Sequence, residues 1–131
     1  MLQRDYLLEV IVRFVEMLAR ALRHAVEQQD EAGCHEAERA VAELLELEPD
    51  TLSALAPNSL VQLMELSGIG ESVCAHAGYA LDRVADIYED LGNDACARMR
   101  RAQAEAIEEA FGFDLSQVPD ELDELDLELF G

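Results

Sequence analysis

Apolar residues fill almost every position between Tyr6 and Glu27, and charged residues form only a narrow stripe along this stretch. At about 100° per residue, six charged positions fall within an arc of roughly 80°; they are Glu9, Arg13, Glu16, Arg20, Arg23 and Glu27. The spacing predicts a helix over residues 4–29. A helix at the edge of a small domain normally gives water a wider polar face. We therefore expect this helix either to run through the middle of the domain or to be shared with another subunit.

The apolar positions of this first helix divide into two sets. The set expected inside the domain consists of Leu7, Ile11, Leu18, Leu22 and Ala25. The set assigned to a protein partner, most simply a second copy related by a two-fold axis, is Val10, Phe14 and Met17. The alternative is burial within the chain, by the segment 60–66 and by the C-terminal end.

Apolar positions with helical spacing recur along the rest of the chain. The segment 34–47 predicts a second helix stopped by Pro49, because a proline ring removes a helical hydrogen bond. A short element at 50–55 and a helix at 57–66 follow, with Pro57 suited to the first helical turn. Two longer helices are predicted at 71–91, ending at Gly92, and at 94–111, closed by Gly112. Residues 1–113 are thus predicted to form an all-α domain of about five main helices.

Residues 114–131 form a separate acidic tail with seven acids and no base. Val118, Leu122, Leu125 and Leu129 would lie on one stripe of a helix, at spacings of three and four residues. Two interpretations remain open. The tail can dock on its own domain or on a symmetry mate, or it can stay loose and bind another protein.

The net charge of −20 limits the kinds of partner that the protein is expected to bind. All nine basic residues are arginines, against 29 acids. A field of this sign repels nucleic acid and anionic membrane surfaces and attracts basic proteins. Solubility alone also explains such a charge.

Neither the thiols nor the imidazoles have the spacing of a catalytic or metal site. Cys34, Cys74 and Cys96 are far apart, so we expect reduced thiols and a cytoplasmic protein. Neighbouring Cys and His residues on one helix point in different directions, so no metal is expected. A nucleophilic cysteine needs a histidine base and an orienting group, and a meeting of Cys74 with His24 in space is the disfavoured alternative. We expect the protein to have no enzymatic activity and to bind no cofactor.

Four arginines, Arg83, Arg98, Arg100 and Arg101, form the only basic cluster. Arg98 and Arg101 share a helix face, and Arg83 can reach them from the neighbouring antiparallel helix. They either form local ion pairs or line a groove that captures an acidic peptide, of this chain or of another.

Two helix pairs resemble tetratricopeptide (TPR) repeats. Small or aromatic residues stand at Ala85, Tyr88, Gly92, Ala97 and Ala104, and a second pair is similar at Ala25, Ala37, Leu44 and Pro49. Arg101 stands where that motif usually has a large apolar residue. Residues 3–110 resemble a family of small bacterial domains of unknown function with a TPR-like fold. The resemblance implies an α-α superhelix and supplies no catalytic residue.

These features predict a non-enzymatic helical scaffold or adaptor for protein–protein interaction that associates with itself, as a homodimer. The predicted interaction residues are Val10, Phe14, Met17, Arg83, Arg98, Arg101, Val118, Leu122, Leu125 and Leu129. The alternative is an acidic regulator or mimic whose C-terminal tail neutralises a basic protein partner. Neither nucleic acid nor a membrane is an expected partner.

Overall fold

The computed structural model describes the backbone of residues 2–131 and the side chains of residues 6–131. Over this range the protein is all-helical and contains no strand. The elements are α1 (Leu2–Gln28), α2 (Glu31–Leu44), α3 (Pro49–Ala54), α4 (Pro57–Leu66), α5 (Glu71–Asp90), α6 (Asp94–Phe111), the 3-10 turn η1 (Asp120–Leu122) and α7 (Asp123–Phe130).

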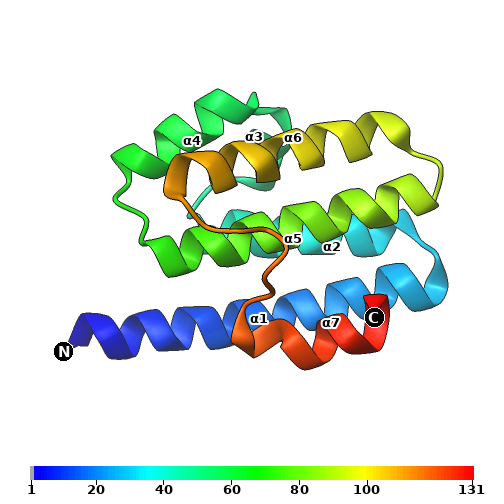
Figure 1. Cartoon of the computed structure of the whole chain (residues 1–131), viewed down its shortest axis with the longest axis horizontal. Helices are drawn as coiled ribbons and strands as arrows, with labels where there is room; N and C mark the ends of the chain where they lie inside the picture. Colours follow the sequence, from blue (N-terminus) through cyan, green and yellow to red (C-terminus); the bar gives the residue numbers. More distant parts are fainter. Residues whose placement is uncertain (1) are drawn as a thin grey trace.

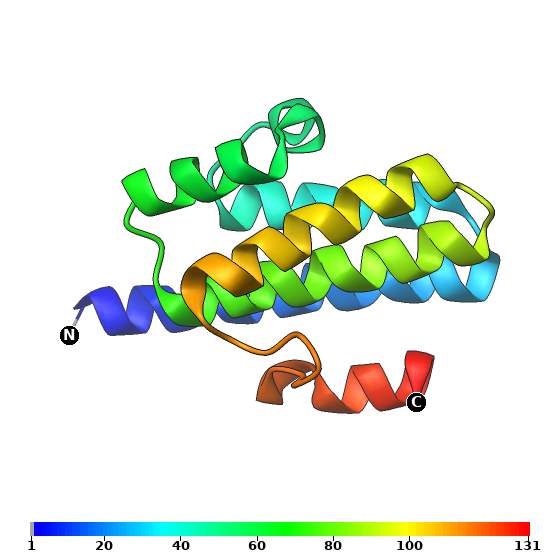
Figure 2. The ribbon, with the colours of Figure 1, turned by 45° about the horizontal axis from the view of Figure 1, so that its top comes forward.

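Two antiparallel helix pairs form the body of the molecule. Helix α1 packs on α2, and α5 packs on α6, while α2 and α5 join the two pairs (Figure 1). Helix α4 packs against α6 on the side away from α1 (Figure 2). The tail crosses the bundle so that α7 lies beside α1 (Figure 1). The core therefore lies between the two pairs, and α1 is at one side of it.

Most helix boundaries follow from single residues. The Asp30 carboxylate accepts a hydrogen bond of 2.9 Å from the Ala32 amide and so caps the start of α2. The Asn93 side chain caps α6 in the same way. Gly92 and Gly112 take positive φ angles after α5 and α6, as a left-handed stop requires. The predicted bounds of α6, 94–111, agree with the structure.

The end of α2 differs from the prediction. The helix stops at Leu44, because Glu46 adopts a left-handed backbone with φ of 58° and the Leu47 amide bonds back to the Ala42 carbonyl. This is the helix-stop geometry usually supplied by glycine. Pro49 stands at the first turn of α3 and does not terminate α2.

A small residue allows α1 and α2 to approach closely. A β-carbon built on Gly33 would lie 2.3 Å from the backbone nitrogen of Ala25. Both residues are buried. The contact fixes the turn between the two helices, and the core of the first pair extends from it toward Leu18 and Val41.

Buried polar side chains of α6 hold the short helix α3. Gln103 donates hydrogen bonds of 3.0 Å to the carbonyls of Leu52 and Leu55, and Arg100 donates one of 3.1 Å to the carbonyl of Ser53. Backbone carbonyls at a helix end have no partner within the helix. These side chains therefore supply hydrogen-bond donors to the end of α3.

The expected inner face of α1 is mostly found inside. Ile11, Leu18, Leu22 and Ala25 are buried, whereas Leu7 is 41 % exposed. Helices α2, α5 and α7 cover the helix from about Phe14 onward. The first turns of α1 extend past these neighbours and keep apolar side chains at the surface (Figure 1).

Candidate protein-interaction site

Large apolar side chains are concentrated at the exposed start of α1. Tyr6 is 64 % exposed, Leu8 is 54 % exposed and Leu7 is 41 % exposed. Isolated surface leucines are common, but three consecutive large apolar residues at the start of a helix form a patch. A patch of this kind is typical of a binding surface.

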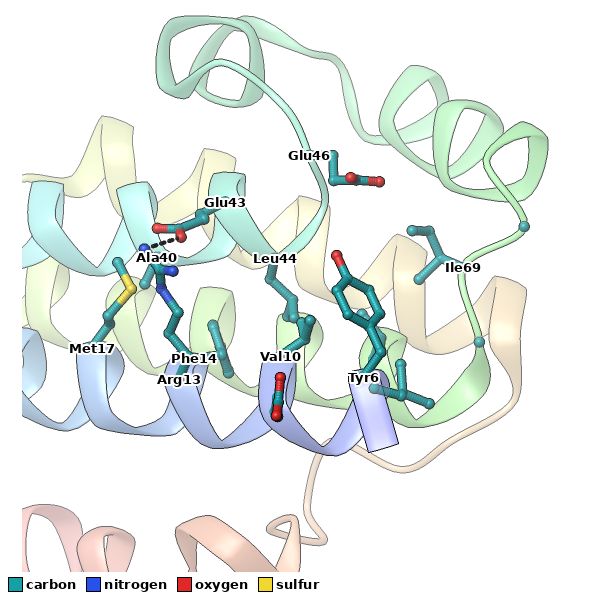
Figure 3. A pocket seen from close by; sticks show the side chains of 15 residues that line it. Tyr6, Val10, Arg13, Phe14, Met17, Ala40, Glu43, Leu44, Glu46 and Ile69 are labelled. Atoms are coloured by element: carbon teal, nitrogen blue, oxygen red, sulfur yellow. Dashed lines mark ion pairs between the residues drawn. The ribbon is translucent and has the colours of Figure 1, made fainter. Parts of the chain in front are cut away.

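One side of this patch opens into a groove of about 630 Å³, which we call the α1 groove. Its walls are α1, the end of α2 and the connection between α4 and α5. Figure 3 shows Tyr6 and Val10 directed toward Leu44 and Ile69 across the opening. The lining residues are Tyr6, Leu7, Glu9, Val10, Arg13, Phe14, Met17, Ala40, Glu43, Leu44, Glu46, Gly68, Ile69, Gly70 and Val73.

The turns that end α2 and α4 shape the walls of the groove. Glu46 and Gly68 both have positive φ angles, of 58° and 69°, and each reverses the chain directly after a helix. The first reversal places the Glu46 carboxylate at the mouth, and the second places Ile69 opposite Tyr6 (Figure 3). The groove therefore results from two helix ends and from a helix longer than its neighbours.

The groove has an apolar floor and an acidic rim. Its charged lining residues are Glu9, Arg13, Glu43 and Glu46. Arg13 forms an ion pair of 2.7 Å with Glu43 and not with Glu9, the partner that helical spacing suggests. Among the side chains of residues 6–131, Glu9 and Glu46 have no ion-pair partner. The net charge of the lining is therefore negative.

The residues predicted to face a partner from α1 divide between the core and the groove. Phe14 is only 3 % exposed and its ring packs edge-on against the His76 ring at 6.2 Å, so Phe14 belongs to the core. Val10 and Met17 are half-buried and line the groove. The physical reason is that α5 passes beside the middle of α1 and covers Phe14.

The predicted arginine cluster is divided among local ion pairs. Arg101 donates to Asp82 and Asp86 of α5 at 2.8 Å. Arg100 is buried and lies 2.9 Å from Glu38. Arg98 is exposed. The cluster does not form one open basic groove.

Arg83 is the one arginine of the cluster that holds the tail. Its Nε and Nη2 donate to the two carboxylate oxygens of Asp126 at 2.8 and 2.9 Å, and its guanidinium lies over the Phe130 ring. Asp126 also accepts a hydrogen bond of 2.7 Å from the Tyr79 hydroxyl. Burial and this hydrogen bond raise the pKa of Tyr79, so the phenol stays protonated and donates.

The tail packs on its own chain. Leu122 and Leu125 are buried, and Leu129 is half-buried against the core. Val118 also packs on the core, but it precedes η1 and so does not continue the predicted helical stripe. Pro119 separates it from the helical part, because proline disfavours a helical residue before it.

His76 fastens the beginning of the tail. Its Nδ1 lies 2.6 Å from the Ser72 carbonyl oxygen and its Nε2 lies 3.0 Å from Glu121. The amide of Glu121 itself and then His76 lower the pKa of this carboxyl group. His76 is buried although Glu121 is exposed. The histidine therefore has a structural role, linking α5 to η1.

The thiols are unsuited to nucleophilic chemistry. Burial raises the pKa of Cys34 to about 12 and that of Cys74 to about 11, so both remain thiols at neutral pH. Cys74 lies in the first turn of α5, whereas His24 lies near the end of α1, at opposite ends of the bundle (Figure 1). The fold therefore does not bring Cys74 and His24 together.

His24 instead links α1 to the start of α2. Its Nδ1 lies 3.1 Å from Glu36 and its Nε2 lies 3.3 Å from Asp30. The hydrogen bond with Glu36 is the main cause that raises the pKa of His24. The side chains of residues 6–131 contain no group of three or more His, Cys, Asp or Glu placed to hold a metal ion.

Sequence reasoning missed Asp126, the acid that the tail buries. A signal was present, because Asp126 follows Leu122 by four residues, which is the spacing of neighbours on one helical face. It also missed Tyr79, which stands four residues before Arg83 on α5. The groove itself depends on two left-handed turns and had no comparable signal.

No family model, curated protein or solved structure matches this chain. In the part of the chain that the structure describes, every helix is too short or too polar to cross a membrane.

Proposed function

We propose that this protein is a non-enzymatic helical scaffold or adaptor that binds a protein segment through the α1 groove and the adjoining start of α1. The pairs α1–α2 and α5–α6 are taken as TPR-like units, as in the bacterial family that the sequence resembles. Self-association into a homodimer is one form of this function, and the cytoplasm is the proposed location.

The observation that carries the proposal is the apolar start of α1 beside an apolar groove. Tyr6 and Leu7 are well exposed and also line the groove, together with the half-buried Val10 and Ile69. Exposed apolar area of this kind costs free energy in water, at roughly 25 cal/mol per Å². A protein partner that covers it gains that free energy, and concave apolar surfaces with a polar rim are typical binding sites.

The second candidate, an acidic regulator acting through its tail, has less support. The apolar anchors Leu122 and Leu125 are buried in their own chain, and Asp126 is bonded to Arg83. The tail would have to give up these contacts before its acids met another protein. Its exposed acids and the exposed Leu127 remain the features that favour this candidate.

Site-specific photo-crosslinking in cells that express the full chain tests the proposal. A benzophenone amino acid is placed at Leu7 in the groove, at Leu127 on the tail, or at Met99 on α6 as a control that is also exposed and apolar. We expect protein adducts at Leu7 and none at Met99.

The tail position separates the two candidates. Adducts at Leu127 without adducts at Leu7 contradict the proposal and favour the acidic regulator. Adducts at all three positions in equal yield show unspecific contact and also contradict it. An adduct with a second copy of the chain at Leu7 supports self-association.

A further inference from the structure

We infer that the α1 groove binds an amphipathic helix whose apolar face is flanked by basic residues. This inference deepens the proposed function and rests on it, since it names the kind of segment that the groove accepts. The argument uses the length of the groove, the chemistry of its floor and the charge of its rim.

The length of the groove suits a helix of about three turns. Its α1 wall runs from Tyr6 to Met17, and eleven residues of helix rise about 16 Å. An apolar face of three turns offers anchors at helical spacing, which is the usual way that a helix binds in a groove. The apolar floor is supplied by side chains from three elements, including Val10, Leu44 and Ile69.

The rim selects the charge of the occupant. Arg13 is neutralised by Glu43 at 2.7 Å, so the two remaining carboxylates, Glu9 and Glu46, set the sign of the field at the mouth. A basic residue beside the apolar face of the ligand can approach either of them. The protein's net charge of −20 adds long-range attraction for a basic segment and increases its rate of association.

Charge also argues against a second copy as the occupant. In a two-fold dimer the same surface patch meets itself, so Glu9 and Glu46 of each copy face the rim of the other. Like charges placed together at an interface are unfavourable. Residues 1–13 of a second copy carry two arginines and two acids, so the start of α1 supplies no net positive charge to compensate.

Fluorescence anisotropy on the full-length protein tests the inference with two labelled synthetic peptides of about 14 residues. Both have leucines at helical spacing; one carries lysines on its polar face, and the other carries glutamates. We expect the Leu/Lys peptide to bind at least tenfold more tightly than the Leu/Glu peptide at about 0.15 M salt.

A pair of double variants tests whether the rim carries this preference. Glu9→Lys/Glu46→Lys changes the groove, and Glu27→Lys/Asp90→Lys makes the same change of net charge on exposed acids at the other end of the bundle. We expect the first variant to weaken binding of the Leu/Lys peptide about fivefold or more, and the second less than twofold. Equal losses would show attraction by net charge alone and overturn the inference.

A pair of single variants tests the floor. Val10 lines the groove, whereas Val12 is exposed about 160° away around the helix. We expect Val10→Gln to weaken the Leu/Lys peptide about tenfold and Val12→Gln to leave its affinity unchanged. Circular dichroism on each variant verifies that it remains folded.

The outcomes distinguish this inference from the proposed function. If both peptides bind with equal affinity and Val10→Gln weakens both, the groove has no preference for basic segments. That result overturns the inference but does not contradict the adaptor function. Light scattering can also show a dimer. If Val10→Gln dissociates that dimer and Val12→Gln leaves it intact, the occupant of the groove is a second copy and the inference of a basic helix is overturned. Absence of peptide binding, of a dimer and of adducts at Leu7 contradicts the proposed function itself.

Discussion

The contact between Asp126 and α5 should decide whether the tail stays docked. Asp126 is buried on α7 and accepts three hydrogen bonds, of 2.7 to 2.9 Å, from Tyr79 and Arg83. The variant Asp126→Ala removes all three acceptor contacts at once. Arg83 keeps one carboxylate partner, Asp86, at 2.9 Å.

The magnitude follows from burial. Removing one member of a fully buried ion pair costs about 3–5 kcal/mol. Arg83 keeps about a quarter of its side chain exposed, so water can replace part of the lost contact. We therefore expect a loss of about 2–3 kcal/mol, a 30- to 150-fold change in an equilibrium constant. Since the tail has only two buried leucines, Leu122 in η1 and Leu125 in α7, this loss should release α7 from the bundle.

Hydrogen exchange measured by mass spectrometry can detect the release. Amides of residues 123–130 should exchange about 30- to 150-fold faster in Asp126→Ala, while amides of α2 keep their protection. Glu124→Ala is the matched control, because Glu124 is an exposed acid of the same helix. If α7 exchanges at the same rate in both variants, the Asp126 contact does not hold the tail and the reasoning is refuted.

Three further predictions concern the first helix pair. Gly33→Ala should destabilise the protein by about 1–3 kcal/mol in urea unfolding, because the added methyl group would meet the Ala25 backbone at 2.3 Å; an unchanged midpoint contradicts the close approach. Glu46→Gly should stabilise it by about 1 kcal/mol, because glycine accepts the positive φ, whereas Glu46→Ala should bring no gain. The pKa of His24 is raised above 6.5, so the stability from its carboxylate neighbours is complete below that pH and disappears as the pH rises through the folded pKa. Unfolding at about pH 6 and pH 8.5 should show this loss in the native protein and a smaller one in His24→Gln.

The helices could be predicted wherever a local signal determines them. The bounds of α6 follow from Asn93 and Gly112, and Pro57 marks the start of α4. Local signals were insufficient at the end of α2, because Glu46 takes a conformation that its side chain does not favour. Pro49 was therefore assigned to the wrong helix, as a stop for α2 when it begins α3.

The site could be predicted only in part, because its residues are distant in the sequence. The periodicity of α1 assigned Val10, Phe14 and Met17 to one partner-facing set. It could not show that Val10 and Met17 line a groove while α5 covers Phe14. The acidic composition of the tail did not reveal which acid would be buried. Pairing of Asp126 with Arg83 needs a reversal of the chain between α6 and α7, and no local pattern encodes that distance.

The lengths of the helices explain why only the start of α1 is exposed. At 1.5 Å per residue, α1 is about 40 Å long, whereas its antiparallel partner α2 is about 21 Å long. The Arg13–Glu43 ion pair marks where α2 ends beside α1. Before that point the apolar pattern of α1 continues without a neighbour from α2, at Tyr6, Leu7 and Leu8. A helix that needed only its own bundle could become polar where its cover ends, so the continued apolar pattern favours a binding role for these turns.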